Sequence, residues 1–366
     1  MNNRRKYLFM VLALSLIFAL GAPVFAQEPT EPALREKYQQ AETLFDEARE
    51  LADEDTAALK QSAIPKLEAA RQLYRATVSR LDEAYCVNWL AGVYSDLGDS
   101  QLALKFYNEA LPLSRAIGDK EGEATMLHAI GKIYDDLGNK RLALKFYNES
   151  LLLSRAIDDK AGEAITLYNI GTVYDSLGNK QLALKFYNRS LPLFRAVEDK
   201  QGEAVTLSNI GTVYDDLGDS QLALKFYGEA LLLFRAVDDK SGEAITLGNI
   251  STAYFILGDI QLALKFDNDS LLLFRAAGDK SGEALTLSSL MTVYESQKVS
   301  LLAAFYGKQS INIYQELRSN IASHDKETQK IYLKSIEDTY HTLANILIAN
   351  GQIAEAEEVL ALLKDE

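Results

Sequence analysis

The sequence predicts an all-α protein, an α-solenoid built from stacked antiparallel helix hairpins. Three observations predict it. The segment Leu-Ala-Leu-Lys-Phe recurs five times with a strict period of 40 residues, starting at 102, 142, 182, 222 and 262. Proline is scarce, with 6 in 366 residues, whereas the helix formers Leu, Ala, Glu and Lys are abundant. Each repeat also has apolar surface left over, which only the next repeat can bury.

The first 26 residues have the pattern of an export signal. Arg4, Arg5 and Lys6 precede an apolar run from 7 to 20, and small residues lie just before Gln27. We therefore expect residues 1–26 to be a cleaved signal peptide, and the mature chain to be periplasmic or extracellular. An uncleaved N-terminal membrane anchor is the alternative, although the run is short for a membrane span.

The mature chain is expected to be strongly acidic. The formal net charge is -14, and removal of the three basic residues of the leader makes it -17. Nucleic acid is therefore a poor partner, and we expect no membrane contact after signal cleavage. A polar or basic peptide fits better, although surplus acid also serves simply as solvated surface. The single cysteine, Cys86, excludes an internal disulfide.

Within one repeat, residues 164–203, two segments of helical periodicity flank Leu-Gly-Asn at 177–179. Gly178 suits the left-handed residue that ends the first helix, and Asn179 can cap the second. Gly171 and Ala183 are small where two helices must approach, opposite bulky leucine and tyrosine side chains. We expect the segment Asp-Lys-x-Gly-Glu, at 119–123 and every 40 residues after it, to extend the turn between hairpins.

The repeats vary along the chain, and this variation predicts its organisation. Five nearly identical repeats run over residues 84–283. Residues 27–83 read as N-terminal capping helices, interrupted by acidic residues at 53–55. Residues 284–366 read as degenerate repeats and a C-terminal cap. Atypical ends are expected of a repeat array, because its outer faces have no neighbour to cover them.

The positions described above carry a family resemblance. A small residue near the middle of the first helix, a tyrosine three positions later, a Leu-Gly-Asn or Leu-Gly-Asp turn, and Ala and Tyr along the second helix resemble the tetratricopeptide repeat. The period of 40 exceeds the usual 34, so the chain is similar to the longer subtype of kinesin light chains and Leu-Gly-Asn repeat proteins. The resemblance implies a right-handed superhelix in which the first helices line a concave groove.

The repeats and the C-terminal tail also resemble part of a second kind of protein. The tail from Phe305-Tyr306-Gly307 to residue 364 is similar to the region ahead of a caspase-like CHAT peptidase domain in bacterial, notably cyanobacterial, proteins. This chain ends at Glu366, and it has no candidate His-Cys pair outside the repeats. We therefore expect a non-catalytic role.

The residues needed for catalysis or metal binding do not gather in the sequence. The three histidines, His128, His324 and His341, are dispersed and have no metal-ligand spacing. No glycine-rich loop follows a strand, so a phosphate site is not expected. We expect no cofactor, no metal and no enzymatic activity. Three glycosylation-type triplets lie within predicted second helices, and we interpret them as by-products of duplication: Asn148-Glu149-Ser150, Asn188-Arg189-Ser190 and Asn268-Asp269-Ser270.

The tetratricopeptide resemblance also predicts where a partner binds, because its first helices present certain positions to the groove. A side-chain amide can donate and accept at once, and so can hold an extended peptide by its backbone. Aspartates would favour Lys or Arg on the partner. The alternatives are that the amides bond to a neighbouring helix and that the acids are solvated surface. The predicted residues are Asn169, Asn209 and Asn249; Thr172, Thr212 and Thr252; Asp135, Asp175 and Asp215; and Trp89 at one end.

Three functions are consistent with this reading. The first is an exported scaffold that binds a protein or extended peptide in its groove. The second is the recognition arm of a CHAT peptidase that is truncated or encoded separately. The third is a self-assembling rod, since similar repeats could stack end to end.

Overall fold

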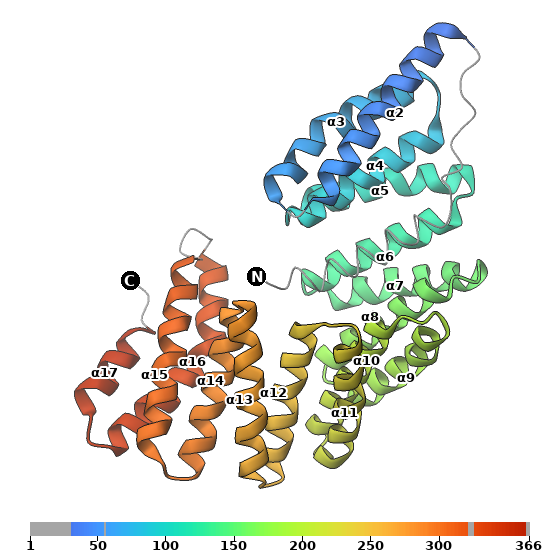
Figure 1. The fold of residues 1–366 in the computed structure, drawn as a ribbon. Helices are drawn as coiled ribbons and strands as arrows, with labels where there is room; N and C mark the ends of the chain where they lie inside the picture. Colours follow the sequence, from blue (N-terminus) through green and yellow to red (C-terminus); the bar gives the residue numbers. More distant parts are fainter. Residues whose placement is uncertain (1–30, 55, 321–325, 364–366) are drawn as a thin grey trace. The chain divides into compact units, whose positions relative to one another are not determined.

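The computed structural model describes residues 31–54, 56–320 and 326–363, and these residues form sixteen α-helices and no strand (Figure 1). The expected signal peptide lies outside them. The chain divides at residue 198 into two compact units, which are described separately. We call residues 31–198 the N-terminal unit and residues 199–363 the C-terminal unit.

Helices of the N-terminal unit pair in sequence order, each packing antiparallel against the next to make four hairpins. The hairpins are α2 (Pro32–Asp53) with α3 (Ala57–Ala76), α4 (Arg80–Asp96) with α5 (Ser100–Ile117), α6 (Lys120–Asp136) with α7 (Lys140–Ala156), and α8 (Lys160–Ser176) with α9 (Lys180–Ala196).

The C-terminal unit repeats this arrangement. Its hairpins are α10 (Lys200–Asp216) with α11 (Ser220–Ala236), α12 (Lys240–Ile256) with α13 (Ile260–Ala277), α14 (Lys280–Ser296) with α15 (Ser300–Asn320), and α16 (Lys326–Ala349) with α17 (Ile353–Ala361). Hairpins stack within each unit, because α11 packs on α12 and α13 on α14 as α7 packs on α8. The predicted α-solenoid is confirmed.

Local signals fix where the helices begin and end. Gly178 has φ +75° after α8, and Asn179 caps α9 by accepting a hydrogen bond from the backbone nitrogen of Leu182 at 3.2 Å. Both roles were predicted. The segment Asp-Lys-x-Gly-Glu was predicted as a turn, and this is wrong. Its Asp caps the first helix of the next hairpin, and its Lys is the first residue of that helix. Asp159, for example, accepts from the backbone nitrogen of Gly162 at 2.9 Å.

In the hairpins α6/α7, α8/α9 and α10/α11 a buried tyrosine packs against a glycine of the first helix. Tyr187 is 1% exposed, and a Cβ atom on Gly171 would lie 2.7 Å from its ring. Gly131 with Tyr147 and Gly211 with Tyr227 repeat this contact. The glycine therefore lets the two helices approach until the tyrosine ring lies on the backbone of the first helix.

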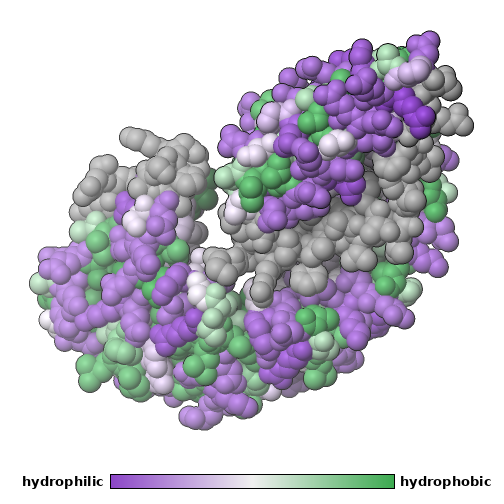
Figure 2. All heavy atoms as spheres, turned by 45° about the horizontal axis from the view of Figure 1, so that its top comes forward, coloured by the Kyte–Doolittle hydropathy of each residue, from purple (hydrophilic) through white to green (hydrophobic). Residues whose placement is uncertain are grey.

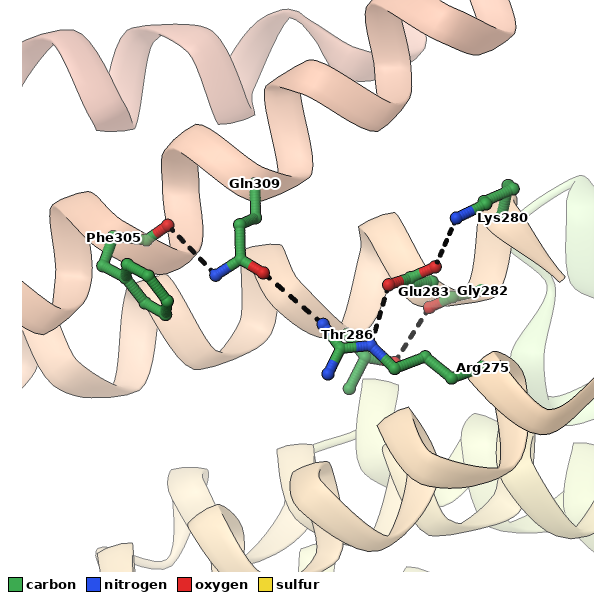
Figure 3. Close-up of polar contacts among 7 residues, drawn as sticks. All are labelled: Arg275, Lys280, Gly282, Glu283, Thr286, Phe305 and Gln309. Atoms are coloured by element: carbon green, nitrogen blue, oxygen red, sulfur yellow. Dashed lines mark hydrogen bonds and ion pairs between the residues drawn. The ribbon is translucent and has the colours of Figure 1, made fainter. Parts of the chain in front are cut away.

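Between hairpins, an ion pair ties the second helix of one to the first helix of the next. In the C-terminal unit, Arg275 Nε donates to Glu283 Oε1 at 2.8 Å, and Lys280 Nζ donates to the other oxygen of this carboxylate at 3.1 Å (Figure 3). Gln309 of α15 accepts a further hydrogen bond from Arg275. The same Arg–Glu hydrogen bond, at 2.6–2.7 Å, recurs as Arg75–Glu83, Arg115–Glu123, Arg155–Glu163 and Arg235–Glu243.

Hydrophilic residues cover most of the described surface in the space-filling view, and hydrophobic residues form small separate groups on it (Figure 2). No helix within the described residues has the length and apolar character needed to cross a membrane.

Candidate functional site

The first helices of neighbouring hairpins contact one another, which gives each unit an inner face. In the N-terminal unit α2 contacts α4 and α6 contacts α8; in the C-terminal unit α10, α12, α14 and α16 contact in succession. No pair of second helices among the described residues makes contact to this extent. The hairpins are therefore closer together on the side of the first helices, as on the concave side of a solenoid.

Asn169 lies on this inner face in the N-terminal unit, where it joins α8 to α6. Its Nδ2 is 3.1 Å from His128 Nε2, and His128 Nδ1 is 3.1 Å from Thr166 Oγ1. If Nε2 accepts from the amide, the neutral ring carries its proton on Nδ1 and donates it to the threonine. All three side chains are buried. Asn169 thus bonds to a neighbouring helix, the alternative considered for the predicted asparagine row.

Two basic side chains of α6 distinguish the inner face of the N-terminal unit. Burial, together with the charge of Lys132, lowers the pKa of His128 to about 4, so its ring is neutral at pH 7. Burial also lowers the pKa of Lys132, while Asp136 and Asp96 oppose this change. Lys132 occupies the repeat position that holds Thr172 in the next hairpin.

The other two predicted asparagines belong to the C-terminal unit. Asn209 and Asn249 are half-buried on α10 and α12. The amide of Asn249 has no hydrogen-bond partner among the described residues. Asn249 therefore keeps its donors and its acceptor available, unlike Asn169.

The predicted threonines have hydroxyls that donate to carbonyl groups of their own helices. Thr172 donates to Asn169 O at 2.8 Å, Thr212 to Ser208 O at 3.2 Å and Thr252 to Gly248 O at 3.2 Å. The hydroxyl oxygens of Thr172 and Thr252 keep lone pairs for an external donor, whereas that of Thr212 also accepts from the hydroxyl of Tyr227, 3.3 Å away. Thr252 is exposed, whereas Thr172 and Thr212 are half-buried.

The predicted aspartates are engaged within the chain. Asp135 pairs with Lys140 at 2.6 Å and Asp175 with Lys180 at 2.8 Å, in each case the first residue of the next helix. Asp215 accepts a hydrogen bond from Ser220. Their position at the end of the first helix brings them to the start of the second, which reduces the acidity that we expected them to give to the groove.

Trp89 packs against the preceding hairpin. Its ring lies edge to face with Phe45 of α2, with centroids 6.4 Å apart, and the guanidinium of Arg49 lies 5.5 Å from its centre. The indole is half-buried, so its described contacts join α4 to α2.

Three equivalent positions on each of α10, α12 and α14 carry glycine or small, uncharged polar side chains. Ser288 Oγ and Thr339 Oγ1 lie 3.1 Å apart between α14 and α16. The positions concerned carry neither aromatic nor charged side chains on α10, α12 and α14. They are Ser208, Asn209 and Thr212; Gly248, Asn249 and Thr252; and Ser288, Ser289 and Thr292.

Asp267, a carboxylate of α13 that is 1% exposed, was not among the residues predicted from the sequence. Its Oδ2 accepts from Ser289 Oγ at 2.8 Å, and its Oδ1 has no partner among the described residues. Burial raises its pKa to about 6. Comparison of the copies could have found it, since the same position holds Tyr147, Tyr187 and Tyr227.

Other candidate chemistry is limited. The serine hydroxyls of the three glycosylation-type triplets are buried, and Ser150 and Ser270 donate to carbonyls of the preceding first helix. Among the described residues, no group of three or more His, Cys, Asp or Glu is placed to hold a metal ion.

A comparison with family models identifies the repeats. The model of the tetratricopeptide repeat matches residues 81–156, 141–196, 163–236 and 202–276, which together span 196 of the 366 residues. The chain therefore belongs to the tetratricopeptide repeat family. No curated protein matches the sequence.

Solved structures share the fold at low sequence identity. A Signal Transduction ATPase with Numerous Domains that has a tetratricopeptide repeat sensor, from Pyrococcus horikoshii, is 19% identical with a TM-score of 0.62; the match covers 89% of this chain and 52% of that one. The apo quorum sensor NprR of B. thuringiensis is 15% identical, with a TM-score of 0.58 over 99% and 93% of the two chains. Apo RapI is 17% identical, with a TM-score of 0.55 over 78% and 99%.

Proposed function

We propose that this chain is an exported, non-catalytic scaffold that binds a protein or an extended peptide on the inner face of its first helices. Asn249 supports this proposal most directly. Its amide lies on the inner face without a hydrogen-bond partner among the described residues, beside the exposed hydroxyl of Thr252. An amide and a hydroxyl in this position can bond to the backbone of an extended segment irrespective of its side chains.

The comparisons add support from the class of protein. Two of the similar structures are described as sensors, one with a tetratricopeptide repeat sensor and one as a quorum sensor. Sensing by a helical repeat protein requires a surface that accepts another molecule. The export component rests on the leader alone, whose basic start and apolar run are those of a secretory signal.

The test uses purified residues 27–366 as bait for proteins of the exported fraction, followed by affinity measurements with the recovered partner. Replacement of Asn209 and Asn249 by Ala should weaken binding about tenfold, since each lost hydrogen bond is worth about 0.5–1.5 kcal/mol. Asn148 and Asn268, which are exposed on second helices, provide a matched double Ala control. Equal affinity in both double variants would rule out the inner face as the binding surface.

A second proposal concerns association with a peptidase. The similarity of the tail to the region ahead of CHAT domains favours a recognition arm that works with a separately encoded caspase-like domain. The reading frames beside the gene provide the test: a neighbouring His-Cys peptidase would support this role, and its absence would leave the independent scaffold.

Self-association is a third proposal, favoured by apolar side chains at the start of α15. Leu301 is 82% exposed and Phe305 56% exposed, where the preceding repeats carry Gln or Arg and Lys. Light scattering of the mature chain should then give a mass above that of one chain, and replacement of both residues by Lys should restore the monomer. A monomer at all concentrations would exclude a rod.

A further inference from the structure

The hairpin α12/α13 of the C-terminal unit departs from the tyrosine–glycine contact. In the pairs α6/α7, α8/α9 and α10/α11, a buried tyrosine covers a glycine of the first helix. In α12/α13 the same repeat positions hold Asp267 and Ser251. A carboxylate therefore occupies a site that is built for an aromatic ring.

Asp267 has fewer partners than a buried anion needs. Ser289 Oγ donates to Oδ2 at 2.8 Å, and Oδ1 has no partner among the described residues. Ser251 lies near enough to the carboxyl group to lower its pKa, but its single hydroxyl proton is donated to the carbonyl oxygen of Ala263 at 2.8 Å and not to Oδ1. No charged side chain of the described residues is among the groups that act on the pKa of Asp267. An ionised carboxylate in this site lacks a compensating positive charge.

The tyrosine ring that Asp267 replaces would extend toward the inner face. In α10/α11 the hydroxyl of Tyr227 reaches Thr212 Oγ1, 3.3 Å away, so the tyrosine spans from the second helix to the inner face. Asp267 is shorter, and the equivalent threonine, Thr252, is exposed. A side chain added at Gly248 would meet a single atom within 4 Å, Ser270 Oγ at 3.7 Å. Gly248 and Thr252 thus occupy the positions that face the tyrosine ring in other hairpins, and Asp267 Oδ1 is buried without a hydrogen-bond partner among the described residues.

From this juxtaposition we infer that Asp267 is the acid of a subsite that takes the ammonium group of a partner's lysine, which enters between Gly248 and Ser289. The inference rests on the proposed function and names part of its ligand. An ammonium matches one open oxygen, whereas a guanidinium bonds best to both oxygens of a carboxylate. The four-carbon stem of lysine is apolar and would take the position of the missing ring, while a chain N-terminus would have to bring its backbone inside.

The inference can be tested without knowledge of the partner, with n-butylammonium chloride as a probe for the lysine side chain. Thermal unfolding of residues 27–366 is followed at pH 7.5 with increasing probe, and n-butanol with matched NaCl is the uncharged control. We expect a saturable rise in the melting temperature that is absent in Asp267→Asn. Asp269→Asn makes the same change two residues along the same helix and should keep the rise.

The proton competes with the ammonium group for Asp267. The apparent affinity for n-butylammonium should therefore fall about tenfold between pH 7.5 and pH 5.0, as the ionised fraction of a group that titrates near pH 6 falls. A rise that persists in Asp267→Asn, or no rise in the wild type, would overturn the inference. So would stabilisation by glycinamide, a probe for a chain N-terminus, without stabilisation by n-butylammonium. Neither outcome depends on partner capture, so the scaffold function is tested separately.

Discussion

Asn169 and His128 bond across two first helices, with 3.1 Å between the amide Nδ2 and the ring Nε2. Both side chains are 8% exposed. A residue predicted to contact a partner therefore also contributes to the stacking of α6 and α8. Its mutation affects stability as well as binding, whereas Asn249 has no hydrogen-bond partner among the described residues.

The first prediction separates these two roles. Asn169→Ala leaves His128 Nε2 buried without a donor, and should lower the free energy of unfolding by about 1–3 kcal/mol. Asn249→Ala removes an amide with no partner among the described residues, and should change it by less than about 0.5 kcal/mol. Urea unfolding followed by circular dichroism measures both. Equal losses would show that the His128 bond contributes nothing to stability.

The second prediction concerns acid and the N-terminal unit. The pKa of His128 is lowered by burial to about 4 from 6.5, so the unfolded chain binds this proton more readily than the folded chain. The stability of the unit is fully present above pH 6.5 and should fall by about 3 kcal/mol as the pH drops toward 4. Hydrogen exchange at the amides of α6 and α8 should accelerate over this range beyond its intrinsic pH dependence. His128→Gln should remove that loss, and the same change at His341, which is exposed, should not.

The third prediction is the opposite response in the C-terminal unit. The pKa of Asp267 is raised by burial to about 6 from 3.8, so the folded state holds this proton more tightly than the unfolded state. Stability is fully present below pH 3.8 and should fall by about 3 kcal/mol as the pH rises through 6. Asp267→Asn should be more stable than the wild type at pH 7.5 and similar to it at pH 3.5. Exchange at the amides of α12–α14 reports this change locally, and an Asn variant that is less stable at pH 7.5 would contradict it.

The fourth prediction compares two glycines within helices. A Cβ at Gly171 would lie 2.7 Å from Cδ1 and Cε1 of Tyr187, so Gly171→Ala should destabilise by about 1–3 kcal/mol. Gly228 lies within α11 and has nothing within 4 Å of an added Cβ. Gly228→Ala should therefore stabilise by about 0.5–1 kcal/mol, because Ala loses less backbone entropy than Gly in a helix. Thermal melts of the two variants should shift in opposite directions.

Several parts of the fold could be predicted because their causes are local. The left-handed Gly178 and the capping Asn179 follow from the conformational freedom of glycine and the hydrogen-bonding reach of a short amide. The Asp-Lys-x-Gly-Glu segment was assigned to the turn between hairpins, as part of the extra length of the 40-residue repeat. In the structure the aspartate caps the helix, and the glycine lies in its first turn, where its backbone N–H donates a hydrogen bond to the capping carboxylate.

The candidate site was less predictable, because each of its polar groups can bond to partners on several elements, and the packing of the helices decides which partner is within reach. The aspartates that we expected to make the groove acidic are bonded within the chain instead. Their partners are Lys140, Lys180 and Ser220, each at the start of the following helix. The kinesin-light-chain subtype and the named binding residues stay predictions.

The sequence by itself determined the helices, their pairing into hairpins and the repeat that stacks them, because a 40-residue period and apolar spacing act through neighbours along the chain. Only the tertiary structure decided which polar side chains are used internally and which stay available. Asn169 is bonded and Asn249 is not, although both occupy the same repeat position, because the preceding hairpin supplies His128 beside one and Ser208 at the equivalent place before the other. Asp267 became a candidate binding residue for a related reason: the sequence shows that it replaces a tyrosine, but only the packed hairpins bury it and leave Oδ1 without a partner among the described residues.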